Sequence, residues 1–138
     1  MKIYNNLKIN KKHQNSVVAI GNFDGIHLGH QKVFYQARQK AKINRLPFGA
    51  ITFEPMPAMF FNKKIKNHRI NSLLQKKNQL KKFKLDFLII IKFNKKFSTL
   101  SAEQFIKNII FTKAKCKFLY VSNNFKFGFK RKGNTQTL

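Results

Sequence analysis

The sequence predicts an α/β domain in which helices cover both faces of a parallel sheet. First, short continuous apolar runs alternate with longer segments whose apolar residues recur at helical spacing, as in strands joined by helical crossovers. Second, the segments with unusual chemistry all follow apolar runs, as ligand-binding loops do at the carboxyl ends of parallel strands. Third, 138 residues with 43% hydrophobic content suffice for one cored domain and are too few for two.

Four apolar runs are expected to form the strands: residues 16–21, 47–53, 86–93 and 117–121. Each run is short, continuous and rich in β-branched or aromatic residues, which is typical of strands buried on both faces. The second run stops at Glu54-Pro55-Met56-Pro57, because two prolines so close together forbid further ladder bonds. The polar and basic residues 1–15 are expected to be a short lead-in.

Helices are expected between these strands, at about residues 27–44, at about 71–83 and from residue 101 onward. Their apolar positions are Leu28, Val33, Phe34 and Ala37 in the first, Leu73, Leu74 and Leu80 in the second, and Phe105, Ile106, Ile109 and Ile110 in the third. The third helix also opens with a capping-box pattern, because Ser101 stands at the N-cap and Gln104 three residues later.

The charge balance is strongly positive, with 29 Lys and Arg against four Asp and Glu, a formal charge of +25. Nucleic acid, phosphorylated small molecules and anionic membrane surfaces all attract such charge. However, Lys, Asn, Ile and Phe share A/T-rich codons, and the basic residues are spread through the chain. We therefore favour the interpretation that a nucleotide bias of the genome produced this composition and that the basic side chains lie on solvated faces. No specific nucleic-acid partner is expected. The scarce acids Asp24 and Glu54 are correspondingly more informative.

Several features predict a cytoplasmic protein with no membrane segment. The longest apolar run, residues 87–91, is far too short to span a bilayer, and the chain begins without an apolar leader. The single cysteine, Cys116, fits a reducing compartment and is not expected to be catalytic. His13 and His68 stand among basic and polar residues and are expected to be exposed to solvent.

The segment GNFDGIHLGH, residues 21–30, carries the chemistry of the chain. A glycine-lined turn lets backbone N–H groups approach an anion, and the following helix N-terminus favours negative charge. His27 and His30 share one helix face, where they can donate hydrogen bonds to a triphosphate and stabilise transition-state charge. No further ligands stand at metal-site spacing, so no protein-held metal is expected. A pair of structural histidines is the alternative.

This segment closely resembles the signature of prokaryotic-type FAD synthetases, the bifunctional riboflavin kinase/FMN adenylyltransferases. Four further blocks resemble the same family in the same order: TFEPMP at 52–57, RINSL at 69–73, FSTLSAEQF at 97–105 and VSNNFKFG at 121–128. Met56 replaces a histidine of the family pattern and Ser122 replaces a glycine. The resemblance runs in register from about residue 16 to the end of the chain.

The resemblance implies a Rossmann-like nucleotidyltransferase fold, and transfer of AMP from ATP to FMN to give FAD and pyrophosphate with Mg²⁺. It implies that His27 and His30 are catalytic and bind the ATP phosphates. The other implied ATP-binding residues are Gly21, Asn22, Phe23, Asp24, Gly25 and Gly29. The implied flavin-binding residues are Phe53, Glu54, Pro55, Pro57, Asn124, Phe125 and Phe127. Asp24 either fixes the loop or belongs to a metal shell, and core packing is the alternative role of Phe125 and Phe127.

The chain stops before a Ser-Ser-Thr-x-Ile-Arg motif of the family. Residues 1–138 are thus expected to be an adenylyltransferase domain whose last elements are missing, without the riboflavin kinase domain. The truncation leaves open whether the chain is active or inactive. Two other functions stay open: a nucleotidyltransferase for another phosphorylated acceptor, and a basic nucleic-acid-binding remnant. The sequence predicts no oligomeric state.

Overall fold

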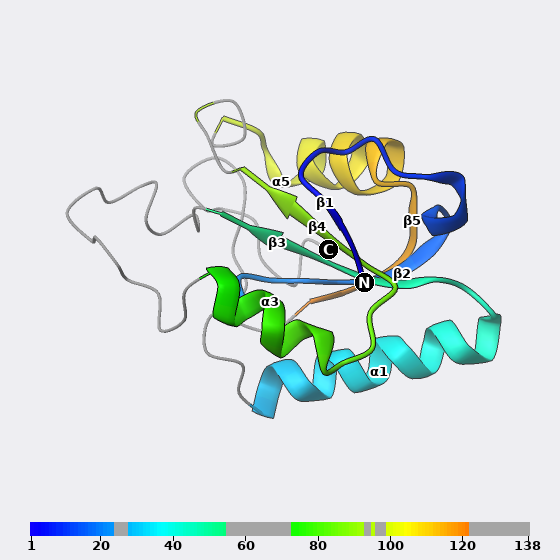
Figure 1. Cartoon of the computed structure of the whole chain (residues 1–138). Coiled ribbons are helices and arrows are strands. Elements are labelled where there is room, and N and C mark those ends of the chain that lie inside the picture. The colour runs from blue at the N-terminus through cyan, green and yellow to red at the C-terminus, as the bar shows by residue number, and fades with distance from the viewer. Residues whose placement is uncertain (24–27, 55–72, 93–94, 96–98, 122–138) are drawn as a thin grey trace.

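The computed structural model describes residues 1–23, 28–54, 73–92, 95 and 99–121. Its strands are β1 (Lys2–Tyr4), β2 (Ser16–Ile20), β3 (Phe48–Phe53), β4 (Phe87–Ile91) and β5 (Cys116–Val121). They form one sheet in the order β1-β4-β3-β2-β5, and every neighbouring pair is parallel (Figure 1). The expected parallel α/β fold is confirmed, and the four predicted strands are β2 to β5.

Helices lie on both faces of this sheet (Figure 1). The helical elements are η1 (Lys11–His13), α1 (Leu28–Asn44), α3 (Leu73–Lys81), α5 (Ala102–Gln104) and η2 (Phe105–Lys113). Alternate residues of a strand point to opposite faces, so Val17 and Ala19 pack into the core under α1 and α3, whereas Val18 and Ile20 pack into the core under η2. Among the described residues, no helix is long and apolar enough to cross a membrane.

The predicted capping box is present at the start of α5. Ser101 Oγ accepts a hydrogen bond from the Gln104 backbone N–H at 3.1 Å, and Gln104 Oε1 accepts one from the Ser101 N–H at 2.9 Å. The helix that follows is a π-helix rather than the expected α-helix: the Ala114 N–H donates to the Ile109 carbonyl, five residues back, at 2.8 Å. Phe105, Ile109 and Ile110 still face the core, because i, i+4 and i+5 also share one side of the wider helix.

The first 15 residues are part of the fold, so the prediction of a lead-in was wrong. β1 pairs with β4 as an edge strand. The expectation of an exposed His13 was also wrong, since the residue is only 6% exposed and its ring stacks on Phe87 with 4.9 Å between ring centroids. The Tyr4 hydroxyl lies 2.7 Å from His13 Nδ1, so an aromatic surface and one polar partner together bury the imidazole. His68 lies outside the described residues.

The strand order places the chemistry of the chain at one edge. From β2 the chain moves through β3 to β4 on one side, and then returns to β5 on the other side of β2. In such sheets ligands bind beyond the carboxyl ends of the strands, at the point where the order reverses. The segments that follow β2, β3 and β5 therefore begin at the edge where a ligand site is expected.

Candidate functional site

The predicted phosphate loop begins where β2 ends and runs into α1. Gly21 and Asn22 directly follow β2, and the Gly21 N–H still donates to the Ile51 carbonyl of β3 at 3.1 Å. Gly29 and His30 lie in the first turn of α1, which begins at Leu28. The expected strand–loop–helix order is therefore present. Asp24, Gly25 and His27 lie outside the described residues, as does the His30 side chain.

The N-terminus of α1 is suited to an anion. The first backbone N–H groups of a helix have no partner within the helix, and its dipole places partial positive charge there. The first turn of α1 contains no acidic residue that would compete for these groups. A phosphate can therefore accept hydrogen bonds from this helix end without displacing a carboxylate.

Phe23, a predicted ATP-binding residue, has its side chain in the core. The ring is buried and lies 4.8 Å, between centroids, from the ring of Phe34 on α1. Its backbone has φ 51°, a left-handed conformation that costs a bulky residue on the order of 1–3 kcal/mol. A Cβ at Gly21 would lie 3.0 Å from this ring. Phe23 can therefore face a ligand only through its backbone, and Gly21 leaves room for the ring.

The end of β3 holds the two described residues of the predicted flavin set. Phe53 is buried and its ring lies 6.0 Å, between centroids, from that of Phe105, so its side chain packs in the core. Glu54 is half-buried, and its N–H donates to the Ile91 carbonyl of β4 at 2.9 Å. The other members of the set lie outside the described residues: Pro55, Pro57, Asn124, Phe125 and Phe127.

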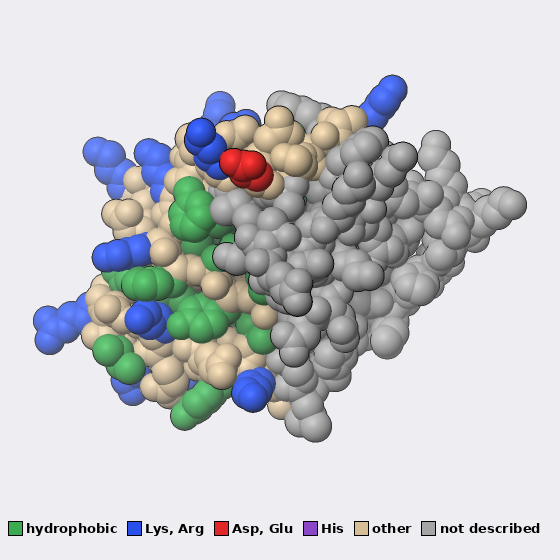
Figure 2. Space-filling model, turned by 180° about the vertical axis from the view of Figure 1, so that it is seen from behind, with side chains coloured by type: hydrophobic (Ala, Val, Ile, Leu, Met, Phe, Trp, Pro, Cys, Tyr) green, Lys and Arg blue, Asp and Glu red, His purple; other side chains and the backbone are tan. Residues whose placement is uncertain are grey.

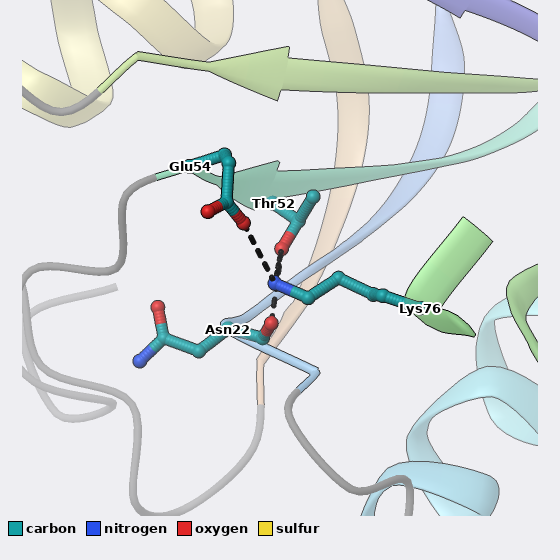
Figure 3. Close-up of polar contacts among 4 residues, drawn as sticks. All are labelled: Asn22, Thr52, Glu54 and Lys76. Atoms are coloured by element: carbon teal, nitrogen blue, oxygen red, sulfur yellow. Dashed lines mark hydrogen bonds and ion pairs between the residues drawn. The ribbon is translucent and has the colours of Figure 1, made fainter. Parts of the chain in front are cut away.

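A buried lysine that the sequence analysis did not single out joins these strand ends (Figure 3). Lys76 of α3 is fully buried, and its Nζ donates to Thr52 Oγ1 of β3 at 3.3 Å. The same Nζ lies 4.0 Å from Glu54 Oε2, an ion pair whose carboxylate side is 18% exposed. The Thr52 hydroxyl in turn donates to the Asn22 carbonyl at 3.1 Å. Lys76 thus connects Glu54, after β3, with Asn22, after β2. It pairs with Glu54 directly and reaches Asn22 through the Thr52 hydroxyl.

A helical signal for Lys76 is present in the sequence. Leu73 and Leu80 stand three residues before it and four residues after it, so all three share one face of a helix. Other lysines stand close to Lys76 in the sequence, so this spacing does not by itself show which of them is buried.

The cluster also contains a buried acceptor that forms no hydrogen bond with the described residues. Asn22 Oδ1 is buried and has no hydrogen-bond partner among the residues that the structure describes. Because a buried acceptor without a donor costs roughly 1–3 kcal/mol, a ligand that brings an N–H or O–H group to this atom gains that energy back. Two cavities of about 470 Å³ lie in the described part of the chain. One is at the carboxyl end of β4 beside residues 5–8, and the other is between α1 and the residues that directly follow α3.

Cys116 behaves as a packing residue, in agreement with the sequence-based expectation. It is buried at the start of β5, where its Sγ lies 3.1 Å from the Phe118 carbonyl. Burial raises the pKa of the thiol to about 12, so it stays protonated at neutral pH. Because the thiolate is the nucleophile, Cys116 has no catalytic reactivity in this environment.

The basic side chains are spread over the surface rather than collected in one patch on the face shown in Figure 2. Lys and Arg side chains of the described residues stand apart from one another there, between apolar and uncharged groups. Dedicated nucleic-acid sites instead group their cations on one face or along one groove. This face therefore offers no specific observation in favour of nucleic-acid binding.

Comparisons with known proteins point in one direction. A family model described as FAD synthetase matches residues 9–138. The chain is 45% identical over 136 residues to a bifunctional riboflavin kinase/FMN adenylyltransferase of Buchnera aphidicola subsp. Schizaphis graminum, and 40% identical over 125 residues to one of Haemophilus influenzae. These matches cover 99% and 91% of this chain but 43% and 41% of the relatives. The chain thus spans less than half of their length.

A solved structure matches the same region. The crystal structure titled as a macrolide-efflux protein from Streptococcus pneumoniae superposes with a TM-score of 0.78 at 27% identity. The match covers 94% of this chain and 43% of that chain. The agreement extends over nearly the whole chain and supports the parallel α/β architecture described above.

Proposed function

The chain belongs to the FAD synthetase family, and on that premise we propose that it transfers AMP from ATP to FMN. The observation that carries the proposal is the position of the GNFDGIHLGH segment, between the carboxyl end of β2 and the first turn of α1. A phosphate-binding loop is expected at that position in a parallel α/β sheet. The chain spans 43% of the first relative, so riboflavin phosphorylation is not part of the proposal.

The proposed reaction is an in-line displacement at phosphorus. A phosphate oxygen of FMN attacks the α-phosphorus of ATP, and the bond from that phosphorus to the oxygen bridging the β-phosphate breaks. Pyrophosphate takes the electron pair of the broken bond, and FAD is the other product. Because such a transfer needs no covalent nucleophile from the protein, positioning and charge stabilisation supply the catalysis.

The ATP side of the proposed site uses the loop and the helix end. His27 and His30 are proposed to donate hydrogen bonds to the phosphates, where charge grows in the transition state. Gly21, Asn22, Phe23, Asp24, Gly25 and Gly29 are proposed to shape the loop around them. ATP is proposed to enter as its magnesium complex, with the metal on the phosphates and mostly water among its other ligands.

The flavin side is proposed to be formed by the segments that follow β3 and β5. Its proposed residues are Phe53, Glu54, Pro55, Pro57, Asn124, Phe125 and Phe127. Because the Phe53 ring packs in the core, this residue contributes its backbone and anchors the segment that follows it. We place the activity in the cytoplasm, since the lone cysteine of the described structure is a free, buried thiol and fits a reducing compartment.

The direct test is FAD formation by the purified chain from FMN and ATP with magnesium. FAD and pyrophosphate in equal amounts are the expected products, and their absence overturns the proposed activity. Phosphopantetheine and nicotinate mononucleotide offered in place of FMN test the acceptor. Faster turnover of either one would assign the chain to a different nucleotidyltransferase reaction.

A further inference from the structure

We propose that Lys76 is a positioning residue that holds the segments after β2 and β3 in register, and so aligns the ATP side of the site with the flavin side. The expected effect of Lys76 on turnover rests on the proposed function. The contacts from which we infer it are all between described residues. Lys76 itself need not touch a substrate, because it acts through Thr52 and Glu54 (Figure 3).

The hydrogen bonds of this cluster run in one direction. A threonine hydroxyl has a single hydrogen, and Thr52 gives it to the Asn22 carbonyl at 3.1 Å. The lone pairs of Thr52 Oγ1 are then left to accept from Lys76 Nζ at 3.3 Å. An ammonium group has three donors and no acceptor, so Lys76 can donate to Thr52 while its charge pairs with the Glu54 carboxylate at 4.0 Å. We call this chain of donation, from the Lys76 ammonium to the Thr52 hydroxyl to the Asn22 carbonyl, the relay.

This relay sets the direction of the backbone where the phosphate loop begins. In a trans peptide the C=O and the following N–H point in opposite directions. Holding the Asn22 carbonyl against Thr52 therefore turns the Phe23 N–H away from the buried lysine. The buried ring and left-handed backbone of Phe23 fix the conformation of that residue as well. Asn22 and Phe23, the last described residues after β2, are thus held in one orientation, although they follow a glycine.

The second branch fixes the start of the flavin side. The Glu54 N–H is bonded to the Ile91 carbonyl at 2.9 Å, and its carboxylate pairs with Lys76 at 4.0 Å. Lys76 is fully buried, and charges in a medium of low polarity interact more strongly than in water. A buried ammonium without its carboxylate would be strongly unfavourable. The pair therefore holds Glu54 through both its backbone and its side chain.

A purely structural role for Lys76 is the competing explanation. Leu80 is also fully buried and packs α3 into the same core as α1, so the helix has apolar anchoring of its own. If Lys76 only helped to dock α3, the loss of its partner Thr52 hydroxyl would change the stability of the protein and leave turnover per folded molecule unchanged. A positioning role predicts a loss of turnover instead.

The experiment uses the threonine, since its side chain can be changed with little change in shape. Thr52→Val removes the hydroxyl and leaves Lys76 paired with Glu54, whereas Thr52→Ser keeps the hydroxyl. Lys76→Met removes the ammonium, and Lys81→Met, on the exposed last residue of α3, is the matched control. For each variant, kcat, the KM of each substrate, the thermal midpoint and amide hydrogen exchange of residues 16–23 are measured.

Loss of a hydrogen bond to the loop is expected to lower kcat of Thr52→Val about tenfold, and loss of the charged donor to lower that of Lys76→Met about 10–100-fold. Thr52→Ser and Lys81→Met are expected to keep wild-type rates. Exchange in residues 16–23 should be faster in Thr52→Val and Lys76→Met only. Because the two residues form one relay, the double variant should lose less than the product of the single losses.

Each possible outcome decides the proposal. Thr52→Val with wild-type kcat in the folded protein overturns it, whatever its exchange rate and thermal midpoint. If Lys76→Met does not fold, the Thr52→Val and Thr52→Ser pair decides in the same way. If the wild-type chain forms no FAD, the proposed function fails, but the exchange data still support or overturn the relay by themselves.

Discussion

The strands of the sheet begin at one edge, the amino edge, and end at the other, the carboxyl edge, and these two edges hold their polar groups differently. At the amino edge, Asp86 Oδ2 accepts a hydrogen bond from the Phe48 N–H at 2.8 Å, and the Asp86 N–H donates to the Phe48 carbonyl at 2.7 Å. At the carboxyl edge, the Glu54 carboxylate faces Lys76 at 4.0 Å, and Asn22 Oδ1 is buried with no partner among the described residues. Backbone bonds between strands are present at both edges, since the Glu54 N–H donates to the Ile91 carbonyl at 2.9 Å. Ser16 Oγ at the amino edge is also buried without a hydrogen-bond partner among the described residues. What distinguishes the carboxyl edge is the fully buried Lys76 with its carboxylate.

The difference separates stability from activity. The amino edge lies at the opposite end of the strands from the proposed site, so substitutions there should lower the free energy of unfolding and leave turnover intact. At the carboxyl edge, the contacts of Lys76 and Thr52 hold residues next to the proposed phosphate loop and flavin segment, so substitutions there should change turnover more than stability. Four substitutions or conditions test this contrast.

His30→Ala is expected to have the largest effect, a loss of about 10²–10³ in the rate of FAD formation, because it removes a donor used in the transition state. The KM for FMN should change little, since the flavin is assigned to the segments after β3 and β5. Initial rates and thermal melts measure both properties. Gln39→Ala, exposed on the same helix, is the control. A folded His30→Ala protein with undiminished turnover would remove His30 from the mechanism.

Gly49→Ala is expected to lower the free energy of unfolding by about 1–3 kcal/mol, as overpacking of a core does. A Cβ at Gly49 would lie 2.2 Å from the ring of Phe87, its partner on the neighbouring strand. Urea unfolding measures the change. In a Phe87→Leu background the same substitution should cost less, because the ring is gone. An equal cost in both backgrounds would show that the ring is not the cause.

His13 is expected to make the stability of the protein depend on pH. Burial, followed by the positive charge of Lys12, lowers the pKa of His13 below its ordinary value, so the unfolded chain binds the proton more readily. Stability should therefore fall as pH decreases from about 6.5, with a slope of at most about 1.4 kcal/mol per pH unit for one proton. His13→Phe should lose this slope and keep its turnover. Urea unfolding between pH 5 and 8 measures this in both proteins. The wild type should take up about one more proton on unfolding than His13→Phe.

Asp86→Ala should have the smallest effect, about 1 kcal/mol of unfolding free energy, because Asp86 is exposed and its hydrogen bond with the Phe48 N–H is only partly buried. Asp86→Asn keeps an acceptor for the Phe48 N–H and should lose less. Turnover of both folded variants is expected to equal that of the wild type. A clear loss of turnover in either variant would break the contrast between the two edges.

Short or buried features of the fold could not be read in advance. β1 is only three residues long, too short for any hydrophobic period, so its pairing with β4 was missed and His13 was expected in solvent. The π-helical hydrogen bonding of η2 was also missed, since the apolar spacing of Phe105, Ile109 and Ile110 fits an α-helix as well. Phe23 and Phe53 belong to the motifs, but packing alone determined that their rings lie in the core.

The sequence by itself determined the four longer strands, the capping box and the position of the glycine–histidine segment between a strand and a helix. Continuous apolar runs, a Ser-x-x-Gln spacing and glycines beside histidines are local patterns with local physical causes. Only the tertiary structure decided that Lys76, one lysine among many, lies buried between Thr52 and Glu54. Burial depends on which elements pack together, and the three side chains meet only because α3 covers the end of β3.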